Sequence, residues 1–238
     1  MEIGIIEAPT VKELFIQKIA GMIINGELQP GEKLPSEREL ASQARISKSA
    51  VHFAMAELER LGFVETSARH GTFVSDYAKR GTIETLNLLV SYSSDSFLDR
   101  RHMEDMLEMR TAIEGKALEV LAETLTPESL KVLEEDVAAS EAIAREAGDI
   151  HSLAVSFFEF HHDICFVSGN FILPLLFNSF RVVTLAYWEH AIRLLGKDTC
   201  IKLMKDLLEL IRKQDAEGAV AFLKEEFDMY LNLTEARR

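Results

Sequence analysis

The 238-residue chain lacks several features that would assign it to common classes of protein. It has only two cysteines, Cys165 and Cys200, which stand in apolar surroundings and not in a Cys-x-x-Cys or zinc-type spacing. We interpret them as buried side chains of a protein in a reducing cytosol. The N-terminus carries acids where a signal peptide carries cations. These absences favour a cytoplasmic protein without a disulfide framework or a structural zinc site.

Catalytic motifs are also missing. The chain contains no glycine-rich phosphate loop, no nucleophile elbow and no His-Glu-x-x-His motif. His161 and His162 are adjacent, but neighbouring residues on a helix point about 100° apart, so the two do not face one site. We therefore predict that the protein is not an enzyme.

Long membrane-spanning runs are absent as well. The longest charge-free run, residues 164–180, has 17 residues and is interrupted by Gly169, Asn170 and Pro174. It is too short and too broken to span a bilayer, so we interpret it as a buried junction between helices.

The chain also lacks an excess of positive charge. Its formal net charge is −13, which by itself argues against a nucleic-acid-binding protein. The acids are unevenly distributed, however. Residues 1–80 hold 10 Lys and Arg against 11 Asp and Glu, whereas residues 81–238 hold 16 against 28, a net charge of −12. Length and charge together predict two domains with different tasks.

The first predicted domain, residues 8–76, begins with helical patterns. Apolar residues recur at helical spacing over 10–25. Ser36 and Glu39 have the spacing of a capping box at the start of a short second helix. Ser47 is placed to cap a third helix.

The end of this domain has a strand pattern. Gly62 stops the third helix, and the alternation in residues 63–66 and 72–74 predicts two short strands around a turn. The order of these elements predicts a winged helix-turn-helix domain with a small β-hairpin wing.

The rest of the chain reads as helical. Residues 77–82 are interpreted as a short polar linker, and residues 83–236 show helical spacing without strand alternation. We expect an antiparallel bundle of about seven helices, so the whole protein is predicted to be mainly α.

The first domain resembles the winged-helix domain of the GntR family of bacterial transcription regulators. The residues that carry the resemblance are Gly31, residues 34–41, Val51, Leu58, Gly62 and residues 70–74. The resemblance implies contacts of the second helix, the third helix and the wing with double-stranded DNA. The predicted DNA-binding residues are Arg38, Arg45, Ser47, Lys48, Ser49, His52, Arg69, His70 and Gly71.

This chain departs from the family pattern at three of these positions. Lys48 and His52 stand where arginines are usual, and Arg45 stands in a turn where glycine is common. Lysine cannot form the bidentate fork that arginine forms, so the family's usual operator sequence is not assumed. Arg38 can contact a phosphate or a guanine edge, and Gly71 allows close approach of the backbone.

The second domain is similar to the ligand-sensing helical (FCD) domain of the FadR subfamily of GntR regulators. The supporting residues are 109–114, 160–161, 168–170, Asp215 and Ala219. Many members hold a metal ion through one aspartate and three histidines. His161 matches the first histidine, but Phe157, Met204 and Glu226 stand at the other three positions. Phe and Met do not ligate zinc or manganese in such sites, so no metal site and no cofactor of the family type is predicted.

The predicted effector site lies inside this helical domain. Seven of the 14 phenylalanines fall between Phe157 and Phe180, which fits either ordinary core packing or an apolar cavity for an acyl chain. Arg110 is the best candidate to bind a carboxylate, and its alternative partners are Glu114 and Glu108 within the chain. The predicted effector-binding residues are Arg110, Phe157, His161, Asn170, Tyr187 and Met204.

These features predict a ligand-responsive transcription regulator. It would bind a pseudo-palindromic operator as a homodimer, because one winged domain reads only a few base pairs. A small organic acid or acyl-type effector would change the affinity for DNA. The alternatives are a metal-containing sensor of a carboxylate metabolite, with a rearranged ligand set around His161, His162 and Glu226, and a scaffold that does not bind DNA.

Overall fold

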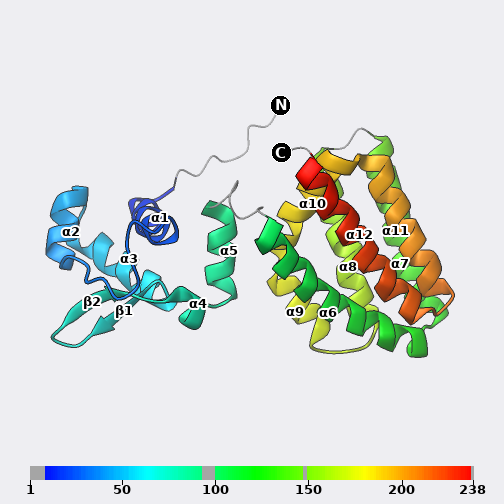
Figure 1. Cartoon of the computed structure of the whole chain (residues 1–238), viewed down its shortest axis with the longest axis horizontal. Coiled ribbons are helices and arrows are strands. Elements are labelled where there is room, and N and C mark those ends of the chain that lie inside the picture. The colour runs from blue at the N-terminus through cyan, green and yellow to red at the C-terminus, as the bar shows by residue number, and fades with distance from the viewer. Residues whose placement is uncertain (1–8, 93–99, 147–148, 237–238) are drawn as a thin grey trace. The chain divides into compact units, whose positions relative to one another are not determined.

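The computed structural model describes residues 9–92, 100–146 and 149–236, and the chain divides into two compact units between residues 94 and 95. The first, which we call the winged unit, holds five helices and two strands of the described residues (Figure 1). The second, the helical unit, is described only by helices. The predicted fold class, mainly α with a winged helix-turn-helix and a helical bundle, is confirmed. No helix in the described part of the chain is long and apolar enough to cross a membrane.

Capping residues begin the three helices of the helix-turn-helix. The helices are α1 (Val11–Ile24), α2 (Glu37–Ala44) and α3 (Lys48–Arg60). Ser36 and Glu39 form the predicted capping box of α2, and the hydroxyl of Ser47 accepts a hydrogen bond from the backbone N–H of Ala50 at the start of α3. These caps satisfy N–H groups that have no partner within the helix.

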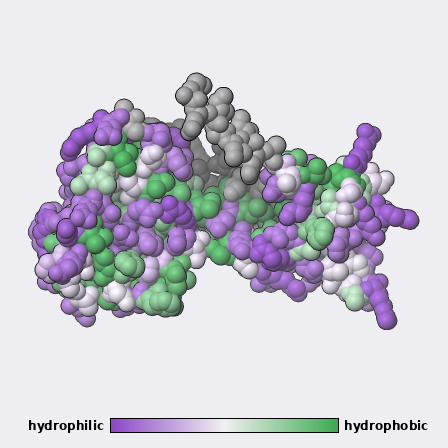
Figure 2. All heavy atoms as spheres, turned by 180° about the vertical axis from the view of Figure 1, so that it is seen from behind, coloured by the Kyte–Doolittle hydropathy of each residue, from purple (hydrophilic) through white to green (hydrophobic). Residues whose placement is uncertain are grey.

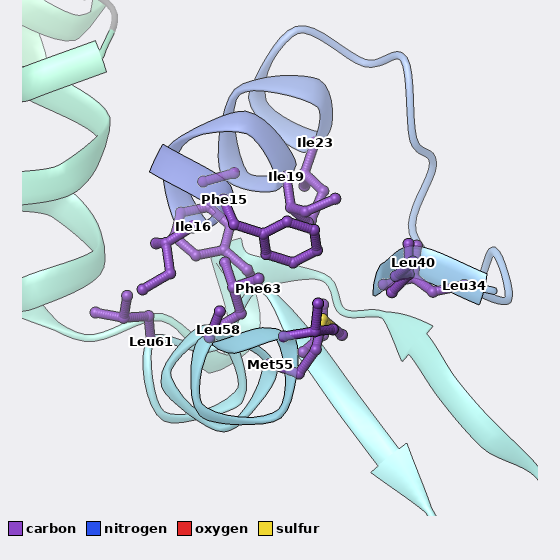
Figure 3. Packing of buried hydrophobic residues seen from close by; sticks show 14 of the residues in the cluster. Phe15, Ile16, Ile19, Ile23, Leu34, Leu40, Met55, Leu58, Leu61 and Phe63 are labelled. Atoms are coloured by element: carbon purple, nitrogen blue, oxygen red, sulfur yellow. The ribbon is translucent and has the colours of Figure 1, made fainter. Parts of the chain in front are cut away.

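The core of the winged unit lies between α1 and α3. Phe15, Ile16 and Ile19 of α1 point toward Met55 and Leu58 of α3 (Figure 3). Leu34 and Leu40 close the side next to α2, and Phe63 fills the space below α1. Burial of one such side chain contributes about 1.5–3 kcal/mol, so this cluster fixes the orientation of α3.

The wing is a two-stranded antiparallel hairpin of β1 (Val64–Ser67) and β2 (Gly71–Val74). Its register pairs Val64 with Val74 and Ser67 with Gly71. The segment before α2 adds to the other edge of β2, since Leu34 N–H donates to Thr72 O at 2.8 Å. The sequence pattern did not indicate this pairing of the segment before α2 with β2. It connects the wing to the N-terminal end of α2.

The residues after the wing belong to the winged unit. Predicted linker residues form the short helix α4 (Tyr77–Arg80), and the next helix is α5 (Ile83–Tyr92). The hydroxyl of Thr85 donates to the carbonyl of Leu61 at 2.5 Å, and Leu88 and Leu89 pack on the winged core. The expected boundary at residues 82 and 83 therefore differs from the observed division at 94 and 95.

Close packing at Gly62 explains this difference. A Cβ atom built on Gly62 would lie 2.8 Å from the carbonyl oxygen of Arg80, and the residue has a φ of 77°. Only glycine fits such a turn without strain. The chain after the wing is thereby held against the end of α3.

The helical unit is a bundle around a central helix. Its described helices are α6 (Arg100–Thr124), α7 (Pro127–Arg145), α8 (Ile150–Val167), α9 (Leu173–Ser179), α10 (Arg181–Leu195), α11 (Lys197–Arg212) and α12 (Ala216–Ala236). Helix α8 packs against α6, α7, α9 and α10, and α12 lies along α6. The described part of this unit thus has seven helices, and residues 83–92 lie outside it.

Candidate functional site

Helix α3 presents its first turns to solvent. Lys48, Ser49 and His52 are exposed, whereas the stripe of Val51, Ala54, Met55 and Leu58 is buried in the core. The cap residue Ser47 is also exposed, and its hydroxyl lies 3.1 Å from that of Ser49. Within its own unit, the N-terminus of α3 is therefore free to meet an anionic partner with hydroxyl groups and with the positive end of the helix dipole.

Four predicted contact residues supply unneutralised positive charge. Arg38, Arg45, Lys48 and Arg69 are exposed, and none of them forms an ion pair with another described residue. Arg60 of the same unit differs, because it pairs with Glu57 and Glu84. The unpaired cations lie on α2, α3 and the wing, the elements that a winged domain places along a duplex.

His52 is held by a neighbouring helix. Its Nδ1 lies 2.8 Å from Oε1 of Glu37 at the start of α2. Because a carboxylate only accepts, Nδ1 carries the proton in this hydrogen bond. The sequence did not indicate this pairing, since the two residues are 15 positions apart.

Two arginines of the predicted surface have left-handed backbone conformations. Arg45 ends α2 with a φ of 55°, and Arg69 in the wing turn has a φ of 68°. The turn between the strands is residues 68–70, with His70 exposed, while Gly71 is the half-buried first residue of β2. The wing therefore presents Arg69 and His70 at its tip, with Gly71 behind them.

The helical unit buries a charged cluster. Arg110 of α6 is 2% exposed, and its Nε donates to Oε2 of Glu114 at 3.1 Å. Nδ1 of His161 on α8 hydrogen-bonds the other carboxylate oxygen of Glu114. Glu114 is therefore the internal partner of Arg110, one of the two alternatives that the sequence left open.

Aromatic rings surround the guanidinium group of Arg110. Its Cζ lies 4.9 Å from the ring centre of Trp188, 5.0 Å from that of Phe227 and 5.5 Å from that of Tyr187. Such cation–π contacts stabilise a cation that has left water. The ring of Trp188 also stacks on His161, with 5.2 Å between the ring centres.

Several polar atoms in and around this cluster have no hydrogen-bond partner. They are Nη1 and Nη2 of Arg110, the hydroxyl of Tyr187, Nε1 of Trp188 and Oε1 of Glu226. A buried polar atom without a partner costs about 1–3 kcal/mol. The arrangement can therefore bind an anion through two parallel N–H groups, with a hydroxyl and a carboxyl group nearby.

Burial and neighbouring charges set the protonation of the cluster. Burial opposes ionisation of Glu114, but His161 and Arg110 outweigh it and lower its pKa. Burial lowers the pKa of His161 and outweighs the opposing effect of the Glu114 carboxylate, while the charge of Arg110 adds to the lowering. Burial raises the pKa of Glu226 to about 7. The interior thus pairs one guanidinium with one carboxylate and holds a second carboxyl group that ionises near neutral pH.

The predicted effector residues do not all have the same environment. Arg110, His161 and Tyr187 are brought into one cluster, and Phe157 packs on Trp188 at 5.1 Å between ring centres. Oδ1 of Asn170 accepts hydrogen bonds from backbone N–H groups at the start of α9, and Met204 is a buried side chain of α11.

Comparisons with known proteins match both units. Residues 12–74 match the gntR family of bacterial regulatory proteins, and residues 105–228 match the FCD domain. The chain is 30% identical over 176 residues to the HTH-type transcriptional regulator Mce2R of Mycobacterium tuberculosis, covering 72% of this chain and 69% of that protein. The chain belongs to the GntR family. It is a transcription regulator, as the sequence predicted, and not an enzyme.

Two further relatives extend this likeness over nearly the whole chain. The HTH-type transcriptional regulator LutR of Bacillus subtilis is 27% identical over 199 residues, 83% of this chain and 87% of LutR. A solved structure described as "Lar controls the expression of the Listeria monocytogenes agr system and mediates virulence" has a TM-score of 0.65 at 16% identity, covering 98% of this chain and 100% of that one. The second likeness supports the fold alone.

The interior of this GntR regulator does not fit the metal site that the family implies. Phe157 and Met204 are buried at two of the ligand positions and offer no hard or borderline donor. His162 points to Asp163 at 3.0 Å, and no group of three potential ligands occurs among the described residues.

The sequence missed part of this cluster. Trp188 and Phe227 were not among the predicted site residues, although each directly follows a residue already considered, Tyr187 and Glu226 respectively. Their only sequence signal is helical spacing, which does not distinguish a ring against a guanidinium group from a ring in the core.

Proposed function

We propose that this regulator binds a pseudo-palindromic operator as a homodimer and that a small organic acid or acyl-type effector in the helical unit changes its affinity for DNA. The observation that carries the effector part is Arg110, whose two terminal nitrogens are buried and unpartnered. A carboxylate fits this pair of N–H groups in a bidentate arrangement.

A surface groove offers room for the apolar chain of such an effector. It lies between α6 and α12 and has a volume of about 500 Å³. Its lining combines apolar side chains with charged ones: Leu107, Ala112, Phe227 and Leu231 with Glu104, Glu108, Lys224 and Asp228, beside Thr111. Phe227 also covers the guanidinium group of Arg110. A turn of this ring would connect the groove with Arg110, so that an apolar chain lies in the groove and its carboxylate reaches the guanidinium group.

A homodimer is supported by an apolar face around α9. Its exposed side chains, all within residues 166–176, are Phe166, Phe171, Ile172, Leu175 and Leu176. Hydrophobic residues are visible at the surface of the helical unit among mostly hydrophilic ones (Figure 2). Residues 164–180 carry no charge, whereas residues 81–238 have a net charge of −12. Two such acidic units repel each other unless they meet through a charge-free face, so we assign this α9 face to a second copy of the chain.

Substitutions at two tyrosines distinguish an effect on effector binding from an effect on stability. The hydroxyl of Tyr187 has no partner, whereas that of Tyr230 lies 2.6 Å from Nδ1 of His190. We expect Tyr187→Phe to weaken effector binding without loss of stability, because it removes only an unpaired hydroxyl. Tyr230→Phe should lower stability by about 1 kcal/mol and leave binding unchanged.

The measurement is a thermal-shift screen of hydroxy acids, dicarboxylic acids and fatty acids against the full-length protein. Acids that bind are then tested for their effect on operator affinity by fluorescence anisotropy. The Arg110→Lys variant should lose the shift, because lysine lacks the bidentate fork. Equal shifts in the wild type and in Arg110→Lys would contradict the proposed site.

A further inference from the structure

The recognition helix α3 has an exposed aromatic side chain that the family resemblance does not explain. Phe53 is 64% exposed. Among the other described aromatic residues of the winged unit, Phe15 and Phe63 are buried and Phe73 and Tyr77 are half-buried. Exposure of a large ring on the helix that meets DNA indicates a contact surface and not a core position.

Phe53 lies on the face of α3 that points away from the core. Ser49, His52, Phe53 and Ala56 are spaced i, i+3, i+4 and i+7 along the helix, and all four are exposed. The buried stripe has the same spacing, starting at Val51. The outward face therefore combines a hydroxyl group, an imidazole and an apolar surface, without an acidic side chain in these positions.

The side chain of His52 lies beside this ring and presents a hydrogen-bonding group. The two ring centres are 5.8 Å apart. Because Nδ1 of His52 donates to Glu37, Nε2 of the neutral imidazole is an acceptor. In the major groove, an adenine presents an N6 donor and the thymine of the same pair presents a 5-methyl group.

We propose that Phe53 is a specificity-determining residue that contacts the 5-methyl group of a thymine in each half-site of the operator. This inference rests on the proposed operator binding through α3. Phenylalanine contacts a thymine methyl group well, because both surfaces leave water on contact.

Deoxyuridine tests the inference, because it differs from thymidine only by the absent methyl group. The operator is first selected from a random duplex library with the full-length protein. Thymines are then replaced by deoxyuridine at matching positions of both half-sites, and affinities are measured by fluorescence anisotropy. At the position that Phe53 contacts, we expect the affinity of the wild type for DNA to fall about fourfold for each methyl group removed. This factor corresponds to the free energy of burying one such group.

The variant Phe53→Ala should bind the thymine and deoxyuridine operators equally at that position. Leu14→Ala is the matched control, since Leu14 is an exposed apolar residue of the same unit, and it should keep the wild-type difference. Photo-crosslinking with 5-iododeoxyuridine at the same position should attach the DNA to Phe53, as located by mass spectrometry.

Two outcomes would overturn the inference in distinguishable ways. A thymine preference that persists in Phe53→Ala, or a crosslink to a residue outside α3, would reject the role of Phe53 alone. Absence of any sequence-selective duplex binding by the wild type would reject the proposed function together with it.

Discussion

At the scale of single residues, the helical unit contains several buried ionisable side chains. Arg110 and Glu114 form an ion pair, whereas Oε1 of Glu226 has no hydrogen-bond partner. Burial raises its pKa to about 7, above the ordinary value of 4.5. A buried carboxyl group of this kind is more easily accommodated in its neutral form.

This raised pKa predicts the pH dependence of stability. The folded state holds the proton of Glu226 more tightly than the unfolded state does. The protonated carboxyl group therefore makes its full contribution to the free energy of unfolding below pH 4.5, and this contribution is lost as the pH rises toward 7. We expect Glu226→Gln to be more stable than the wild type at pH 8, by on the order of 1–3 kcal/mol at about 1.4 kcal/mol per pKa unit.

Urea unfolding at pH 5 and pH 8 measures this effect, and the gain should shrink at pH 5. The exposed neighbour Glu225 supplies the control, since Glu225→Gln also removes one negative charge from α12. A gain for Glu226→Gln that is the same at both pH values would exclude titration as its cause.

At the scale of the elements, the turn between α2 and α3 contains a charged residue, Arg45, in a strained backbone conformation. Arg45 holds a φ of 55° at the end of α2, where a glycine would be free of strain. Its exposed guanidinium group forms no ion pair with another described residue. We infer that arginine is placed here for contact with DNA, at a cost to the stability of the turn.

Two substitutions separate these effects. Arg45→Gly and Arg45→Ala both remove the charge, so both should weaken operator binding and reduce its dependence on salt concentration to the same degree. Only glycine relieves the left-handed conformation, so Arg45→Gly should be more stable than Arg45→Ala by about 1 kcal/mol. Anisotropy titrations at several salt concentrations and thermal unfolding provide the two readings; full DNA affinity in both variants would refute a phosphate contact.

At the scale of the whole molecule, the winged unit and the acidic helical unit are joined through the segment after α5. Helices α4 and α5 pack with the winged core, as Thr85 and Gly62 show. Under the proposed function, a change caused by the effector would therefore act on a winged unit that includes α5. The proposed homodimer supplies the two copies whose spacing such a signal would change.

The assigned dimer face gives a prediction of assembly. We expect Leu175→Glu to shift the protein from dimer to monomer and to weaken operator binding strongly, because it places a charge in the charge-free face. Leu14→Glu is matched in exposure, 50% against 53%, and should leave the dimer intact. Light scattering coupled to size exclusion measures the mass; a Leu175→Glu variant that stays dimeric would remove the α9 face from the proposal.

Much of the winged unit could be predicted because its signals are local. Ser36, Glu39 and Ser47 act on N–H groups within three residues, and the buried stripe of α3 follows from helical spacing. The boundary after the wing could not be predicted, because the contact of Thr85 with Leu61 joins residues 24 positions apart.

The sequence by itself determined the family, the order of the elements and the cations on α2, α3 and the wing, because capping, periodicity and motif spacing are properties of neighbouring residues. Only the tertiary structure decided that Arg110, His161 and Tyr187 meet, with Trp188 and Phe227 around them, and that Phe53 is left outside the core. These outcomes depend on how helices distant in the sequence pack. Burial then sets which charges are neutralised and which polar atoms remain without a partner.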